Sequence, residues 1–427
     1  MKVLIVGGGG REHAIALKIK ENPEVTALYA APGNGGIAQI ATCLPFKATD
    51  VDGIVRWAVE NKVDFVIVAP DDPLCLGMVD ALAEQGIPAF GPRKNAAIIE
   101  GSKVFSKNLM KKYGIPTAAY ETFDDYDAAV KYLQTADMPI VVKADGLALG
   151  KGVLICPDRE SAVEAVASMM KEAKFGASGA RVVIEEFLTG PEVSVLAFTD
   201  GKTVKPMVSS MDHKRALDHD EGLNTGGMGT IAPNPCYTPE LARRCMDEIF
   251  LPTIAAMNAE GRTFTGCLYF GLMMTPKGPK VIEYNCRFGD PETQVVLPLL
   301  KSDLLTIMRA TVDGTLADTP VEFASGAACC VVLASGAYPV SYKSGYPISG
   351  LDEAGKTATV FHAGTKLVDG QIVTAGGRVL GVTATADTLE AAIDKAYQAA
   401  DKITFTDMHM RRDIGQRALA SRKESHS

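Results

Sequence analysis

The sequence predicts a multidomain protein of mixed α/β and α+β class, with an N-terminal doubly wound parallel sheet, a central unit and a C-terminal β-rich domain. Three observations predict it. Short apolar strands alternate with helical patterns over the first part of the chain. A strand, a glycine-rich stretch and a second strand then follow one another around Gly146. Beyond residue 320, short strands separated by Gly, Pro and Asp turns become frequent.

Composition limits the functions to consider. The chain has 427 residues, too many for one ordinary core, and a net charge of −8 without a basic cluster, which argues against nucleic acid as a partner. The nine cysteines contain no C-x-x-C pair, which indicates reduced thiols. The apolar start is too short for a signal peptide, and no apolar run approaches a membrane span. A cytoplasmic location without membrane contact is expected.

The first strand pattern, Val3–Val6, runs into four glycines and a helix start. Backbone N–H groups at a helix start bind phosphate, and glycine allows close approach. A dinucleotide site is rejected because Glu12 stands where the third glycine would fall, and because no acidic residue follows the second strand, Ala27–Ala31. The second glycine turn, Pro32–Gly36, suits a smaller phosphorylated ligand. Two tight turns without a ligand remain the alternative.

The alternation then continues to Phe90. Helices are expected at Asp52–Asn61 and Leu76–Gln85, strands at Asp64–Val68 and Ile87–Phe90, and a loop at Ala69–Leu74. Four strands interleaved with helices predict a parallel sheet, with ligands beyond the carboxyl ends of its strands.

The central unit begins with a helix at residues 102–112. Ser102 is its expected N-cap, and Lys103 in its first turn is unusual because cations are disfavoured there unless an anion lies nearby. The stretch Met138–Cys156 is expected to form a hairpin whose glycine-rich flap and lysines, Lys143 and Lys151, close over phosphates. This stretch does not match the Walker phosphate-binding pattern. Solvated lysines on an ordinary long hairpin are the alternative.

Further elements follow in this order: strands at Arg181–Leu188 and Glu192–Phe198, irregular loops at Ser209–Arg215 and Gly222–Gly229, a helical stretch at Pro239–Gly261 and a strand at Thr263–Met274. Loops this long inside a compact unit are usually functional or disordered, and their embedded Met and Leu residues favour function.

The stretch Val281–Gln294 carries the most chemistry. On a strand, side chains alternate, so Ile282 and Tyr284 are expected on one face and Glu283, Asn285 and Arg287 on the other. Two oxygen ligands suit Mg²⁺ that bridges nucleotide phosphates, and the guanidinium suits a phosphoryl group or a carboxylate. A half-buried hairpin with an ordinary polar face is the alternative.

The remaining residues are expected to contain a helix at Leu297–Gly314 that holds Asp303 near its start, strands at Ala327–Leu333, Thr359–His362, Gln371–Thr374 and Val379–Ala384, and a closing helix at Glu390–Lys402. Residues Lys423–Ser427 are expected to fray.

Seven segments of the sequence occur in the order that is found in one known protein family: Gly9–Ala14, Pro32–Asn34, Glu100–Lys103, Lys143–Gly152, Ile184–Phe187, Asn224–Gly229 and Ile282–Gln294. In this combination the chain resembles the phosphoribosylamine–glycine ligases, a family of the ATP-grasp superfamily, over essentially its whole length. Three departures stand out: Asp71 where the family has Glu, Leu223 where it has Pro, and Gly8 where it has Asn or Ser. The first puts a contact of Asp71 with the phosphosugar in doubt.

The resemblance implies a domain of residues 1–101, a two-lobed ATP-grasp unit at 102–320 with its small lobe at about 120–192, and a domain at 321–427. It implies that ATP and Mg²⁺, or Mn²⁺, are used to join glycine to 5-phosphoribosylamine through glycyl phosphate, in purine biosynthesis. A monomer or weak homo-oligomer is expected.

The same resemblance implies the residue roles. Glu283 and Asn285 would bind the metal, and Arg287, Lys143 and Asp212 would be catalytic. The ATP set would be Lys103, Lys143, Asp145, Gly146, Gly150, Lys151, Gly152, Glu185, Phe187 and Glu192. The substrate set would be Gly9, Gly10, Asn34, Gly35, Asp71, Asp212, Lys214, Gly226, Gly227 and Arg287.

Two rival functions predict different residues. Another ATP-grasp ligase of purine synthesis would keep the metal and lysine residues but change residues 209–229 and 287–294. A nucleotide-binding regulatory module without turnover would have lost Glu283, Asn285 or Arg287, and all three are present.

Overall fold

The computed structural model describes residues 1–148 and 151–424. Its N-terminal part contains a five-stranded parallel sheet in the order β3-β2-β1-β4-β5. The strands are β1 Lys2–Gly7, β2 Ala27–Pro32, β3 Thr42–Cys43, β4 Phe65–Val68 and β5 Ala89–Phe90; the helices are α1 Gly10–Lys20, α2 Val51–Glu60, α3 Asp71–Cys75, α4 Met78–Glu84 and α5 Lys94–Gly101. The predicted doubly wound sheet is confirmed.

Two details of this sheet differ from expectation. Residues 69–74, expected to be a loop, include most of α3, which Pro70 precedes in an extended conformation. The expected helix at Leu76–Gln85 begins only at Met78, because Gly77 has a φ of +88° and separates α3 from α4. Strand β3, two residues long, is too short to recognise from a pattern.

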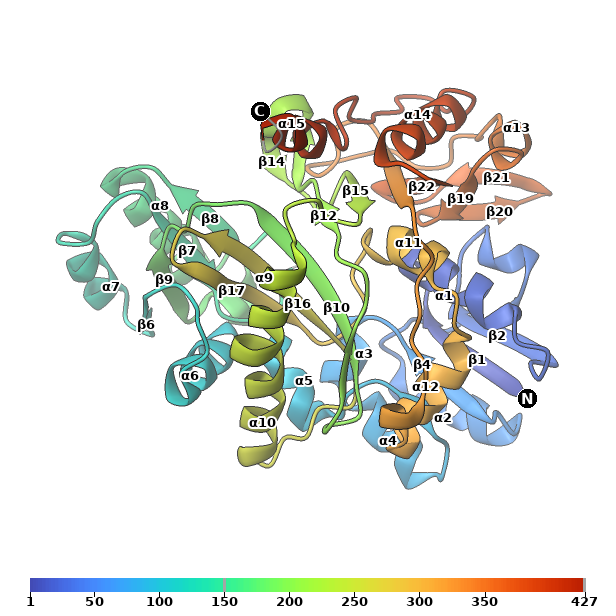
Figure 1. Cartoon of the computed structure of the whole chain (residues 1–427), viewed down its shortest axis with the longest axis horizontal. Coiled ribbons are helices and arrows are strands. Elements are labelled where there is room, and N and C mark those ends of the chain that lie inside the picture. Colours follow the sequence, from blue (N-terminus) through green and yellow to red (C-terminus); the bar gives the residue numbers. More distant parts are fainter. Residues whose placement is uncertain (149–150, 425–427) are drawn as a thin grey trace.

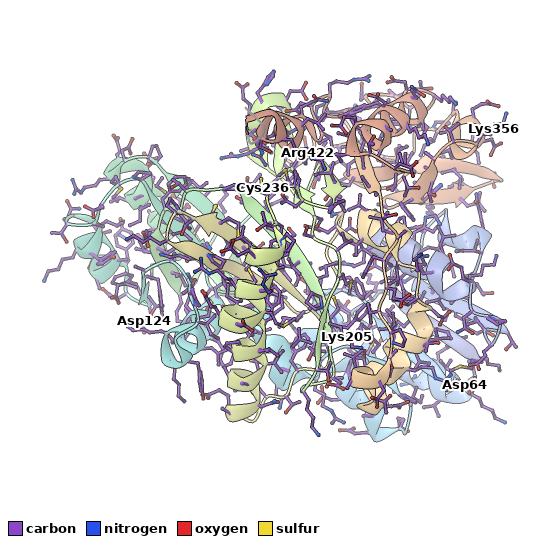
Figure 2. The ribbon with its side chains drawn as sticks, viewed as in Figure 1. Asp64, Asp124, Lys205, Cys236, Lys356 and Arg422 are labelled. Atoms are coloured by element: carbon purple, nitrogen blue, oxygen red, sulfur yellow. The ribbon has the colours of Figure 1, made fainter. Side chains whose placement is uncertain are left out.

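The central unit contains two antiparallel sheets (Figure 1). The smaller, β6-β9-β7-β8, is covered by two helices and projects from the body; its elements are β6 Tyr120–Phe123, α7 Tyr126–Leu133, β7 Ile140–Ala144, β8 Val153–Cys156, α8 Arg159–Met170 and β9 Val182–Glu186. In Figure 2 the label of Asp124 marks this projecting part, on the opposite side of the molecule from Asp64 and Lys356. The predicted hairpin is confirmed as the β7–β8 pair.

The larger central sheet has the order β11-β10-β16-β17. Its strands are β10 Glu192–Thr199, β11 Val204–Pro206, β16 Gly266–Thr275 and β17 Gly278–Asn285; the neighbouring helices are α6 Lys103–Tyr113, α9 Pro239–Cys245 and α10 Leu251–Ala259, the last two joined by a π-helical turn at Met246–Phe250. Ser102 caps α6 as expected, since its side chain accepts a hydrogen bond from the Phe105 N–H.

A β-bulge in β17 corrects the predicted side-chain alternation. Gly271 pairs with Glu283 while the next residue, Leu272, pairs with Val281, so Ile282 is an extra residue. The bulge places Val281 and Tyr284, and not Ile282, in the hydrophobic core. Glu283 and Asn285 therefore lie on the predicted polar face, but Val281 takes the place of Ile282 beside Tyr284 on the core face.

The C-terminal sheet takes strands from two distant parts of the chain, in the order β12-β15-β18-β22-β19. Strands β12 Met211–Asp212 and β15 Gly229–Ala232 join β18 Ala327–Ala334, β19 Thr359–His362 and β22 Arg378–Ala386, and α14 Leu389–Ala400 packs on the sheet. Figure 1 shows β12 and β15 between the central sheets and the C-terminal strands. A hairpin of β20 Thr365–Val368 and β21 Gln371–Thr374, α13 Leu351–Gly355 and α15 Gln416–Glu424 complete this part.

Residues 209–229 are consequently more ordered than expected. The predicted irregular loops contain β12, β13 Arg215–Leu217 and β14 Glu221–Asn224. The pairing partner of β15, strand β18, lies about a hundred residues later in the chain, so local sequence gives no sign of it. The expected helix at Leu297–Gly314 is also divided, into a 3₁₀ turn at Leu297–Leu299 and α12 Leu304–Asp313, which Asp303 caps; a short helix, α11 Thr293–Val296, precedes the turn.

Among the described residues, no helix is long and apolar enough to cross a membrane. The expected fraying of residues 423–427 falls largely outside the described residues, which end at 424. The domain boundaries at residues 101 and 320 stay predictions.

Candidate active site

A buried carboxylate between two lysines joins helix α6 to the smaller central sheet. Helix α6 supplies Lys107, β7 supplies Lys143 and β9 supplies Glu185, each less than 6% exposed. The Lys107 ammonium lies 2.7 Å from Glu185 Oε2, and the Lys143 ammonium pairs with Oε1. Burial alone would raise the pKa of Glu185, but the two ammonium groups outweigh burial and lower it. Lys143 also donates to the carbonyl of Ile282 at 3.2 Å, which places it beside β17.

The start of α6 is fixed by the loop after β7. Lys103 donates its ammonium to the carbonyl of Gly146 at 2.9 Å, and burial lowers the pKa of Lys103. Asp145 accepts hydrogen bonds from the Ser102 hydroxyl at 2.9 Å and from Arg181 Nε at 2.9 Å. Both carboxylate oxygens of Asp145 therefore bond to protein groups that orient the start of α6.

The flap between β7 and β8 is described only in part. Gly150 lies outside the described residues. Gly152 accepts a hydrogen bond from the Ala144 N–H at 2.8 Å, which closes the hairpin. Lys151 is exposed, and its ammonium lies 3.4 Å from the carbonyl of Pro339 in the C-terminal part. The flap therefore reaches across to the C-terminal part of the chain.

A second charged cluster lies at the end of β17. The Lys214 ammonium is 3.5 Å from Glu283 and 3.8 Å from Glu192, and Glu283 is the main cause that raises the pKa of Lys214. Burial raises the pKa of Glu283, but Lys214, Lys143 and Lys103 outweigh it, and the pKa is lowered. Glu283 is therefore a carboxylate at neutral pH.

Arg287 connects this cluster to the N-terminal part. Its Nη2 donates to Glu100 Oε1 at 2.9 Å and to Asn285 Oδ1 at 3.3 Å. Burial alone would lower the pKa of Arg287, but Glu100 and Asp71 raise it. Within the described part of the chain, its buried Nε has no hydrogen-bond partner. A donor that is out of water and unsatisfied is costly unless a ligand uses it.

Asp212 and Glu292 form a pair of acids near the loop at 226–229. Burial and then the charge of Glu292 raise the pKa of Asp212 well above its usual value. Burial also raises the pKa of Glu292, whose Oε1 lies 3.3 Å from the hydroxyl of Tyr269. A Cβ on Gly227 would lie 2.5 Å from Asp212 Oδ1, so glycine lets the loop approach this carboxylate.

A cavity of about 340 Å³ lies between the N-terminal and C-terminal parts. Its walls are Gly8, Gly9, Gly33, Asn34, Asp290, Tyr338, Ala363, Gly364, Thr365, Ala375 and Arg378. It thus includes Gly9 and Asn34 of the predicted substrate set. Gly10 and Gly35 lie beside it, and the Gly35 N–H donates to the carbonyl of Thr365.

The N–H groups at the start of α1 are not free. Glu12 Oε2 accepts from the Gly9 N–H at 2.8 Å, and Asp290 Oδ2 accepts from the Arg11 N–H at 3.2 Å. Two protein carboxylates therefore already bind two of the N–H groups that the sequence predicted for a phosphate. The wall of the cavity at this point presents Asp290, a group that prefers hydrogen-bond donors.

Three family models match most of the chain, one after another. They describe the phosphoribosylglycinamide synthetase N domain at residues 1–100, its ATP-grasp (A) domain at 101–293 and its C domain at 328–417. The chain belongs to the phosphoribosylglycinamide synthetase family. It is a ligase.

Relatives from this family match the chain over essentially its full length. A phosphoribosylamine–glycine ligase of Halalkalibacterium halodurans is 48% identical over 100% of this chain and 99% of its own, and one of Allochromatium vinosum is 49% identical over 98% and 99%. The crystal structure of the Thermotoga maritima enzyme has a TM-score of 0.86 at 34% identity and covers 97% of this chain and 100% of its own. A Campylobacter jejuni biotin carboxylase, at 15% identity and a TM-score of 0.75, shares the fold.

The structure brings most of the residues predicted for this synthetase together. Lys214 forms ion pairs with Glu192 and Glu283, and Arg287 bonds to Asn285 near the end of the same strand. Phe187 is half-buried just after β9, and Asp71 starts α3, where its charge acts on Arg287. Gly226 donates its N–H to the Tyr338 hydroxyl at 3.2 Å.

Sequence reasoning missed five residues at this site. Lys107 was detectable, because it lies four residues after Lys103 on the same helix. Glu100 and Glu292 lie inside recognised segments, but a carboxylate within a motif does not by itself indicate which group it pairs with. Tyr338 and Arg378 lie in the C-terminal part; Arg378 donates to the carbonyl of Asp290 at 2.8 Å, a contact over 88 residues. No local pattern predicts it.

Proposed function

We propose that this ligase uses ATP to join glycine to 5-phosphoribosylamine through glycyl phosphate, releasing glycinamide ribonucleotide, ADP and phosphate in purine biosynthesis. The observation that carries the proposal is the charged group of Glu283, Lys214 and Arg287, in which the two cations lower the pKa of Glu283. A separate cavity, lined by Gly9 and Asn34, is large enough for a phosphosugar. The names of the full-length relatives support it.

The chemistry explains why the site holds charges and no nucleophile. A carboxylate is a poor electrophile, so glycine must first be phosphorylated before an amine displaces phosphate. Neither step needs a covalent bond to the protein. Catalysis is then positioning and charge neutralisation. Water has to be excluded, because an acyl phosphate hydrolyses.

ATP would lie between the two central sheets. Lys103 and Lys143 would contact its phosphates, and the flap residues Gly146, Gly150, Lys151 and Gly152 would close over them. Phe187 and Glu192 would contact the purine and the ribose. Glu185 and Asp145 would act by holding Lys143 and the start of α6 in place, because protein groups already pair with their carboxylates.

Glu283 and Asn285 fit a divalent cation. No group of three His, Cys, Asp or Glu residues able to hold a metal occurs among the described residues, so the protein alone does not enclose one. Two oxygen ligands suit Mg²⁺, or Mn²⁺, that is completed by nucleotide phosphates and water. When bound, the cation would neutralise phosphate charge. The lowered pKa of Glu283 keeps its carboxylate available for this purpose.

Arg287, Lys214 and Asp212 would bind glycine and the transferring phosphoryl group, with the unpaired Nε of Arg287 as the donor. Gly226 and Gly227 would let the loop close on them. Gly9, Gly10, Asn34 and Gly35 would hold the phosphosugar in the 340 Å³ cavity. Asp71 would act on Arg287 from the N-terminal part.

The test is ADP release by the purified protein with ATP and Mg²⁺. Glycine and freshly made phosphoribosylamine are added singly and together. We expect ADP only when both are present, a loss of at least about a hundredfold in Glu283→Ala, and normal rates in Glu353→Ala, which changes an exposed glutamate of α13. Turnover with another acid and amine, but not with this pair, would favour a different ATP-grasp ligase.

A further inference from the structure

Two buried histidines join the N-terminal and C-terminal parts beside the 340 Å³ cavity. His13 lies in α1 and His362 ends β19; each is 5% exposed, and their ring centroids are 5.5 Å apart. A Cβ on Gly36 would lie 2.6 Å from His13 Cε1 and 2.5 Å from His362 Cγ. Three segments therefore converge on the pair, and the third must be glycine to fit.

Hydrogen bonding fixes the state of His13. The backbone N–H of His362 donates to His13 Nδ1 at 2.7 Å, so Nδ1 carries no proton and the neutral ring keeps its proton on Nε2. Burial and the neighbouring His362 lower the pKa of His13 to about 3. His13 is therefore a constant hydrogen-bond acceptor near neutral pH and not a pH switch.

The position of His362 sets two walls of the cavity. Its carbonyl accepts from Asn34 Nδ2 at 2.8 Å, and its ring Nδ1 lies 3.0 Å from the Thr365 hydroxyl. Asn34 and Thr365 both line the cavity, as do Ala363 and Gly364 directly after His362. One imidazole nitrogen on α1 thereby holds the strand end that shapes the cavity.

We infer that His13 is a positioning residue for the phosphosugar: its Nδ1 anchors β19 so that Asn34 and Thr365 face the ligand. The inference rests on the proposed function, which assigns the phosphosugar to this cavity. A histidine that only filled the core would affect all substrates alike. A histidine that shapes the cavity affects the binding of the phosphosugar alone, because Lys103, Lys143 and Glu283 are not among the residues that line the cavity.

Three variants test this. His13→Leu keeps the approximate volume and removes the acceptor, which leaves the His362 N–H buried and unpaired. We expect its KM for freshly made phosphoribosylamine to rise about tenfold or more, with the KM values for ATP and glycine within about twofold. In His13→Asn the amide oxygen stands as many bonds from Cα as Nδ1, so most of the affinity should return. His13→Gln places that oxygen one bond farther and should rescue less.

Two kinds of failure are distinguishable. If the wild-type protein does not turn over phosphoribosylamine, the proposed function fails and this inference falls with it. If the wild type is active but His13→Leu raises all three KM values equally, or lowers kcat alone, only the inference is overturned. If circular dichroism shows that His13→Leu does not fold, the Asn and Gln variants provide the test. Equal KM values for phosphoribosylamine in these two variants would overturn the inference, because the position of the acceptor oxygen would then not matter.

Discussion

At the scale of single residues, Glu185 and its two lysines behave as one unit. The carboxylate is buried and lies within ion-pair distance of Lys107 and Lys143. Charges out of water stabilise a fold only when they are paired, and removing one partner leaves the rest uncompensated. The triad therefore ties the small lobe to α6, and it holds Lys143 where ATP would need it.

We expect Glu185→Gln to lower the free energy of unfolding by about 3–5 kcal/mol at pH 7, because two cations lose their counter-charge. The pKa of Glu185 is lowered in the folded state, so its contribution is complete above about 4.3, the value of a free glutamate, and is lost as pH falls further. Urea unfolding at pH 7 and pH 3.5 measures both. Glu186→Gln, an exposed neighbour, is the control. An equal effect at the two pH values would contradict the assignment.

Asp212 and Glu292 give a prediction for pH dependence. The charge of Glu292 helps to raise the pKa of Asp212, so Glu292→Gln should lower that pKa. If the Asp212 carboxylate is needed for catalysis, activity falls as pH drops through its pKa. The acid limb of the kcat/KM profile should therefore move to lower pH in Glu292→Gln. Glu322→Gln, on the surface, should leave the limb in place. An acid limb that does not move in Glu292→Gln would show that protonation of Asp212 is not what lowers the activity at acid pH.

At the scale of elements, the loop at 226–229 depends on glycine for a steric reason. Gly227 has a φ of +121°, and an added Cβ would meet both Asp212 Oδ1 and Pro291 Cδ at 2.5 Å. The loop therefore lies against the acid pair and against the turn that follows Arg287. The loop also contacts the C-terminal part, because the Gly226 N–H donates to the Tyr338 hydroxyl.

Gly227→Ala should lower kcat by about a hundredfold or more, because misplacing substrate-positioning groups by an ångström is costly. ATP binding, measured by calorimetry, should remain near the wild-type value, since the lysines and the flap are elsewhere. Gly314→Ala is the matched control: its φ is +76°, and no atom lies within 4 Å of the added Cβ. Unchanged kcat in Gly227→Ala would mean that the loop does not approach the substrates.

Most elements were predictable where periodicity is local, and the failures have identifiable causes. The hairpin at β7 and β8 and the cap at Ser102 followed from strand patterns and end signals. The bulge at Ile282 did not, because an extra residue in a strand changes no composition. Strand β12 was predicted as a loop and β15 was not predicted, because β12 pairs with β15 and β15 pairs with β18, which is remote in sequence.

At the scale of the whole molecule, the site is shared by all three parts of the chain. Glu100 pairs with Arg287, Tyr338 with Gly226, and Arg378 with Asp290, each across a long sequence separation. Charged residues of the central unit could be predicted because their types and order were informative. The contributions of Tyr338 and Arg378 could not, since only the folded chain brings them to the cavity.

A chain that ends at residue 326 should therefore be neither active nor stably folded. It would lack β18, β19 and β22 and leave β15 paired only with the two-residue strand β12, although every residue proposed for the ATP site is present. Circular dichroism and urea unfolding measure the loss, and addition of a separate 327–427 fragment should restore part of it. A cooperative, active 1–326 protein would show that the C-terminal part is dispensable.

The shared sheet also has a consequence for synthesis on the ribosome. Strands β12 and β15 leave the exit tunnel about a hundred residues before β18 completes their sheet. The N-terminal sheet and the small lobe have all their strands by residue 186 and can fold earlier. Until β18 is made, the sheet that holds the loop carrying Gly227 is incomplete. The proposed ATP site, between the two central sheets, would have all its strands by Asn285 and so before β18 is made, and the nascent chain would gain its ATP site before its C-terminal wall.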